Sequence, residues 1–173
     1  MPIKKKKRLA THQVPMTVCT STGRNELLSL LESVKFSNPV AATLTMKKRA
    51  CGLSADQIIA SRNFQHFRNR INHKVLGSRA KRYGARLQMI VVMEMSADHR
   101  LHFHSMIDRP CGYSFTEFAA IIREQWWKTD FGYHQVDVQD QPNVGWIDYI
   151  LKQRQKSSLL DSIDWTNCQL IAE

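Results

Sequence analysis

The chain has 173 residues, 43% of them hydrophobic, and a formal net charge of +10 at neutral pH. This length and composition are typical of one globular domain with short extensions. No apolar run reaches the roughly 20 residues that a membrane-spanning helix needs. Four cysteines are spaced widely without a Cys-x-x-Cys pair, which argues against zinc-knuckle and dithiol redox proteins.

A short amphipathic helix is expected at 23–36, after a basic, irregular start. The elements expected after it are a strand at 40–46, a helix from Ser54 to Gly77, a hairpin with strands at 86–95 and 101–107, a helix at 114–128, a strand at 132–138 and a helix at 142–156. This order predicts an α+β fold, with a central antiparallel sheet, helices packed on one face and the other face partly free. We divide the chain into a basic N-terminal arm with a short helix (1–38), one domain (39–156) and a C-terminal tail (157–173).

The positive charge is concentrated in one part of the sequence, because residues 57–93 contain no acidic side chain. A segregated positive field is typical of a protein with a polyanionic partner, most often a nucleic acid. A charged surface that only keeps the protein soluble gives the same pattern. The residues expected to contact phosphate groups are Arg62, Arg68, Arg70, Lys74, Arg79, Lys81 and Arg82.

Two histidines, His102 and His104, lie in the second strand of the predicted hairpin. Side chains alternate between the faces of a strand, so both imidazoles point to the same side. If the turn is centred on Asp98, Glu94 lies directly opposite His102, with the Cβ atoms roughly 5 Å apart. These three groups would form an open set of metal ligands, although a histidine pair that only belongs to the surface gives the same local pattern.

The predicted helix at 142–156 carries Tyr149 and Lys152 one turn apart. On a helix they share a stripe that is separate from the apolar arc containing Trp146. A neighbouring ammonium group favours the phenolate form and can hold a phosphate, which makes Tyr149 a candidate nucleophile. A tyrosine at the edge of the core gives the same pattern, and Tyr133 is a second candidate.

Together these motifs resemble those of the HUH superfamily of single-strand DNA endonucleases. The matching features are the strand Ala42–Thr45, the His-Phe-His motif preceded by Glu94, and Tyr149 followed by Lys152 on a late helix. Within the superfamily the chain is most similar to rolling-circle replication initiators, the Rep proteins. Relaxases usually have a third histidine where this chain has the glutamate.

The resemblance implies an RRM/ferredoxin-like HUH endonuclease fold and site-specific nicking and joining of single-stranded DNA at an origin. It implies that Glu94, His102 and His104 hold Mg²⁺ or Mn²⁺, although the ligand set alone would also accept Zn²⁺. It further implies that Tyr149 forms a 5′-phosphotyrosine bond and that Lys152 positions the phosphate. The sequence has no Walker-type glycine-rich loop, so a separate helicase is an expected partner.

Two alternatives are compatible with the same sequence. One is a single-tyrosine transposase of the same superfamily, and the other is a non-catalytic basic single-stranded-DNA-binding protein or repressor. The coexistence of the three candidate ligands with Tyr149 favours an enzyme. The expected location is the cytoplasm of a bacterium or a phage-infected host, or the nucleus if the host is eukaryotic, without contact to a membrane.

Overall fold

The computed structural model describes residues 29, 31, 33–142, 146 and 162–170. Its centre is a four-stranded antiparallel sheet with the strand order β4-β5-β1-β6. In chain order these strands are β1 (Pro39–Met46), β4 (Met89–Met95), β5 (Leu101–Asp108) and β6 (Gly132–Asp140). Helix α2 (Gln57–Leu76) lies between β1 and β4 in the chain, and α4 (Phe115–Trp127) between β5 and β6. This β-α-β-β-α-β connectivity is ferredoxin-like, and it confirms the predicted fold class.

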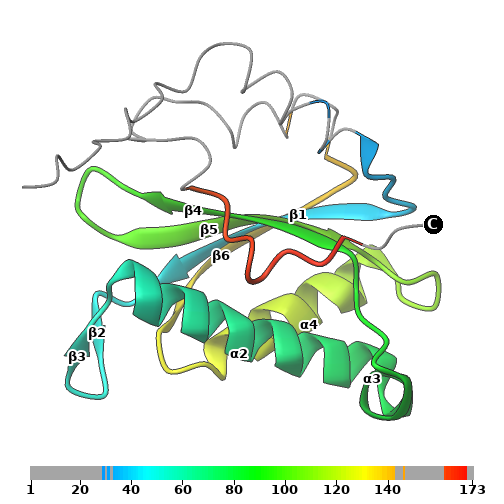
Figure 1. The fold of residues 1–173 in the computed structure, drawn as a ribbon, viewed down its shortest axis with the longest axis horizontal. Helices are drawn as coiled ribbons and strands as arrows, with labels where there is room; N and C mark the ends of the chain where they lie inside the picture. Colours follow the sequence, from blue (N-terminus) through cyan, green and yellow to red (C-terminus); the bar gives the residue numbers. More distant parts are fainter. Residues whose placement is uncertain (1–28, 30, 32, 143–145, 147–161, 171–173) are drawn as a thin grey trace, which may run out of the picture.

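Helices α2 and α4 cover the same face of the sheet (Figure 1). Phe64 of α2 packs against Phe103 of β5, with ring centroids 4.7 Å apart. Trp126 of α4 is fully buried, and its indole N–H donates a hydrogen bond to the carbonyl oxygen of Thr45 at 2.9 Å. Each such buried aromatic side chain contributes roughly 1.5–3 kcal/mol. The main core therefore lies between the sheet and the two helices.

Helix α2 begins two residues later than predicted. Ser54 is not its N-cap, because it lies in the short strand β3 (Leu53–Ser54), which pairs with β2 (Arg49–Ala50). The cap is Asp56, whose Oδ1 accepts a hydrogen bond from the backbone N–H of Ile59 at 2.7 Å. The prediction was wrong because a hairpin with two-residue strands is too short to produce a periodic pattern.

Gly77 ends α2 as predicted, and its φ of 54° lies in the region that favours glycine. A short helix, α3 (Ser78–Tyr83), follows and was not predicted. Strand β4 accordingly begins at Met89, three residues later than expected from the sequence.

Gly132 allows the end of α4 to approach the start of β6 very closely. A Cβ atom at this position would lie 2.0 Å from the carbonyl oxygen of Trp126 and 2.8 Å from Oγ1 of Thr129. Asn63 of α2 braces the same turn, because its Nδ2 donates to Thr129 Oγ1 and its Oδ1 accepts from the N–H of Phe131, both at 3.1 Å. These contacts fix β6 beside β1.

The C-terminal segment 162–170, red in Figure 1, runs along the outer edge of β4. Met89 and Gln169 exchange two backbone hydrogen bonds of 2.9 Å, and the N–H of Asp164 donates to the carbonyl oxygen of Val91 at 3.0 Å. An uncovered strand edge can pair with other chains. The described part of the predicted tail thus protects this edge of the sheet.

The sheet face opposite α2 and α4 carries a smaller apolar cluster. This second cluster consists of Leu31, Ile90, Val92, Met106 and Ile163. Trp146 is partly buried and packs against it. Most of the helix predicted at 23–36, and all but Trp146 of residues 143–156, lie outside the described residues. Among the helices in the described part of the chain, none has the length and apolar character needed to cross a membrane.

Candidate metal centre and nucleic-acid interface

The β4–β5 hairpin brings Glu94 opposite His102. The two residues are register partners, and they lie on the face opposite α2 and α4. The turn between the strands is closed by Ser96, whose backbone N–H donates to the carbonyl oxygen of Arg100 at 2.9 Å. The register predicted from a turn centred on Asp98 is therefore confirmed.

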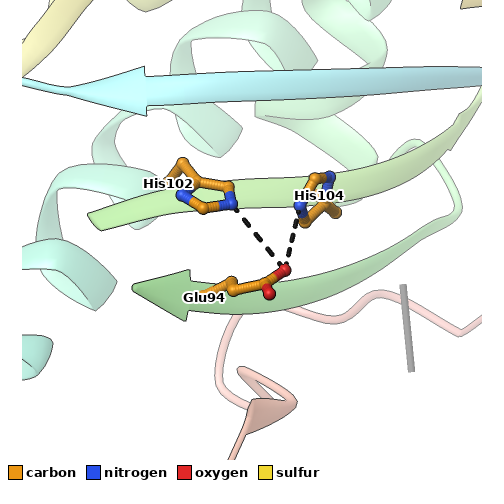
Figure 2. Close-up of side chains that lie close together, drawn as sticks. All are labelled: Glu94, His102 and His104. Carbon is orange, nitrogen blue, oxygen red and sulfur yellow. Dashed lines mark ion pairs between the residues drawn. The ribbon is translucent and has the colours of Figure 1, made fainter. Parts of the chain in front are cut away.

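The side chains of Glu94, His102 and His104 converge on this face (Figure 2). Oε2 of Glu94 lies 3.2 Å from Nε2 of His104 and 3.7 Å from Nε2 of His102. The two imidazole rings are almost perpendicular, at an interplanar angle of 86°, and their centroids are 4.8 Å apart. The carboxylate is thus shared between two imidazole nitrogens that point at it from the neighbouring strand.

These separations fit one metal ion. Bonds of roughly 2.0–2.2 Å put neighbouring nitrogen and oxygen ligands about 3–4 Å apart, and both Glu94 separations lie in that range. The side chains are only 9–24% exposed, so an ion held by them would be largely shielded from solvent. Two imidazoles and a carboxylate accept several divalent ions, and the cluster alone does not select one.

Thr43 of β1 contacts the cluster from the side opposite Glu94, because β5 lies between β4 and β1. It is the register partner of His104, and its Oγ1 lies 3.2 Å from Nδ1 of that imidazole. When Nε2 of a histidine binds a metal, Nδ1 carries the proton and needs an acceptor, which a hydroxyl group provides. Sequence reasoning did not assign this contact. The signal that could have pointed to it is the alternation of Thr43 and Thr45 with apolar residues along β1.

Tyr133, the second candidate nucleophile, lies at the start of β6. The guanidinium carbon of Arg100 lies 4.6 Å from the centre of its ring, within the range of a cation–π contact. The ring of His134 is 4.0 Å away on centroid distance. The Tyr133 ring therefore contacts both Arg100 and His134.

The preferred nucleophile, Tyr149, and its neighbour Lys152 lie outside the described residues. Their positions relative to the ligand cluster remain a prediction. The nearest described residue before them is Trp146, which packs on the second cluster. That cluster includes Val92, the register partner of His104, so the chain enters this region on the same face as the ligands.

The basic residues expected to contact phosphate lie on α2 and on α3. Phe103 separates His102 from His104 along β5 and packs against Phe64 of α2, so α2 and the ligand cluster are on opposite sides of the sheet. Of these basic residues, Arg68 has a structural contact: its Nη1 donates to the carbonyl oxygen of Thr166 at 2.7 Å. Burial is the main factor that lowers the pKa of this guanidinium. Contacts of the others with DNA remain a prediction.

The fold and the cluster define an α+β protein with a ferredoxin-like sheet that presents a glutamate and two histidines as a possible metal centre. The profile of the replication-associated protein ORF2/G2P family matches residues 39–158. The match covers more than half of the chain, and the protein belongs to this family of replication-associated proteins. No curated protein and no solved structure gives a significant match.

Proposed function

We propose that the protein is a metal-dependent enzyme that nicks and rejoins single-stranded DNA at an origin and so initiates rolling-circle replication. The convergence of Glu94, His102 and His104 on one face of the sheet is the observation that carries the proposal. Membership in a replication-associated family supports the biological role. We propose Mg²⁺ or Mn²⁺ as the ion and a separate helicase as the partner.

In the proposed reaction the phenolic oxygen of Tyr149 attacks the scissile phosphorus in line. The bond from tyrosine oxygen to phosphorus forms while the bond from phosphorus to the 3′ oxygen breaks. The phenolic proton passes to water, and the 3′ oxygen takes a proton from water to leave as a free hydroxyl. The 5′-phosphotyrosine bond keeps the phosphodiester energy, so the reverse reaction can reseal a strand without ATP.

The chain's own residues would divide the remaining work. A bound divalent ion would act as a Lewis acid toward the negative charge of the phosphate. Glu94, His102 and His104 would fix the position of that ion, and Lys152 would hold the phosphate and favour the phenolate form of Tyr149. Thr43 keeps the His104 ring directed at the cluster.

The described anchors on either side of Tyr149 support its role as the nucleophile. Trp146 and Ile163 both pack on the second cluster, which contains Val92. Val92 is two residues from Glu94 along β4 and pairs with His104. Trp146 before Tyr149 and Ile163 after it therefore lie on the side of the sheet that carries the ligand cluster.

A denaturing gel tests the proposal. Single-stranded origin DNA and Mn²⁺ should give a protein–DNA adduct that survives SDS. Tyr149→Phe should remove the adduct and leave DNA binding nearly unchanged, because only a hydroxyl group is lost. The matched control is Tyr133→Phe, which should keep the adduct.

A double variant tests the metal dependence. The protein that carries both His102→Ala and His104→Ala should lose cleavage while it retains most of its DNA affinity. If Tyr133→Phe alone removes the adduct, the nucleophile is Tyr133. If wild-type protein binds DNA but forms no adduct with any divalent ion, the protein is the non-catalytic binder, and the proposal fails.

A further inference from the structure

A shallow groove lies between α2 and α4, on the side of the sheet opposite the ligand cluster. Its volume is ≈ 440 Å³. The side chains that line it are almost all cationic groups or amides, and none is a carboxylate. They are Asn69, Arg70, His73, Lys74, Gln125 and Lys128.

The groove carries an excess of positive charge. Lys128 forms an ion pair with Glu124, one turn earlier on α4. The pKa of Glu124 is lowered first by this hydrogen bond and, to a smaller extent, by the nearby charge of Lys74. Within the described residues, no salt bridge pairs Arg70 or Lys74 with a carboxylate. Arg70, Lys74 and Lys128 thus carry three permanent positive charges, against the single negative charge of Glu124.

Arg70 lines this groove, and its side chain is only partly exposed. Its Nε is shielded from solvent and finds no hydrogen-bond partner among the described residues. A guanidinium group held in this way loses little additional freedom when it binds an anion, and its planar set of donors matches a phosphate. Gln125 of α4 is buried and contributes an amide at the floor of the groove.

We propose that the α2–α4 groove is a second DNA-binding site, which holds backbone phosphates of the DNA that flanks the scissile segment. The inference rests on the proposed function, because DNA is the polyanion that this function brings to the protein. The groove and the ligand cluster lie on opposite sides of the sheet, so one short single strand at the cluster does not reach both. The DNA in the groove is therefore a separate segment, such as a duplex arm beside the nick.

This proposal differs from a diffuse positive field over the whole basic span. A diffuse field predicts that any two exposed basic residues of α2 and α3 contribute equally to affinity. A built groove predicts that Arg70 and Lys74 contribute more than Arg79 and Lys81, which carry the same charge on α3 and do not line the groove.

Equilibrium binding to two DNA probes tests the groove. One probe is a short single-stranded oligonucleotide, and the other is longer and ends in a hairpin. Arg70→Gln with Lys74→Gln should weaken binding of the hairpin probe about tenfold and reduce the salt slope by about two units, with little effect on the short probe. The matched control, Arg79→Gln with Lys81→Gln, removes the same charge from outside the groove. Since these residues are also expected to contact phosphate groups, it should weaken binding of the hairpin probe, but only about threefold or less.

Three outcomes would overturn the inference. Equal losses in both double variants would mean a diffuse field, and no loss in either would mean that DNA does not use this side. If ATP binds the wild type and not the groove variant while affinity for the hairpin probe is unchanged, the groove is a nucleotide site. The assay involves no cleavage, so it remains decisive even if the nicking reaction is not found. Thermal unfolding of both variants checks that their folds are equal.

Discussion

Replacing Thr43 with valine removes the hydroxyl group that lies 3.2 Å from Nδ1 of His104. Valine has nearly the same shape as threonine, so the packing of β1 is kept and the change isolates one polar contact. His104 is buried, with 7% of its surface exposed, and water does not easily replace the lost partner. We expect the variant to fold and to bind a divalent ion more weakly.

The size of the effect follows from the environment of this contact. Loss of a hydrogen bond to a buried group costs about 1–2 kcal/mol, and 1.4 kcal/mol corresponds to about a tenfold change in affinity. Partners behind metal-binding histidines usually change affinity by roughly 10–100-fold. Since Thr43 supports only one of the two imidazoles, we expect a loss near the lower end, about tenfold.

The assay is isothermal titration of the protein with Mn²⁺, together with thermal unfolding of the metal-free protein. Thr45→Val is the matched control. Thr45 lies on the same strand and is the register partner of His102. Its hydroxyl group makes no hydrogen bond within the described part of the chain. The control should bind Mn²⁺ like the wild type. Equal affinities for wild type and Thr43→Val, or an equal loss in both variants, would refute the supporting role of Thr43.

Three other measurements test contacts that stabilise the fold. Gly132→Ala should lower the free energy of unfolding by on the order of 3 kcal/mol or more, because its Cβ would overlap the carbonyl oxygen of Trp126; chemical denaturation with less than about 1 kcal/mol of change would contradict this. Asp56→Ala should cost about 1 kcal/mol in the same assay through loss of the α2 cap, and no change would mean that the cap is not used. Burial raises the pKa of the Cys168 thiol from about 9 to about 11, so its stabilising contribution is present below pH ~9 and is lost as the pH rises to ~11. Over that range wild type should lose about 2 kcal/mol more stability than Cys168→Ala, and parallel curves would exclude this linkage.

Local patterns in the sequence were enough to predict the hairpin and its ligands. Glu94, His102 and His104 lie within eleven consecutive residues, and a short turn joins strands whose side chains alternate strictly. A turn centred on Asp98 leaves one register that puts all three groups on one face. The order of the longer elements β1, α2, β4, β5, α4 and β6 was predictable for the same reason, since each is defined by its own periodicity and its own end residues.

Contacts between distant residues were decided only by the tertiary structure. Thr43 and His104 are 61 residues apart. The alternation of residues along β1 indicates that Thr43 and Thr45 share a face, but it does not indicate which distant strand lies beside them. The sequence grouped the basic residues by charge, but the packing of Phe103 on α2 determines that they lie on the side opposite the ligands. The same packing directs Arg68 to Thr166 and brings Arg70 into a groove with α4. Periodicity gives the faces of one element, whereas the neighbour that each face meets depends on how the whole sheet and its helices pack.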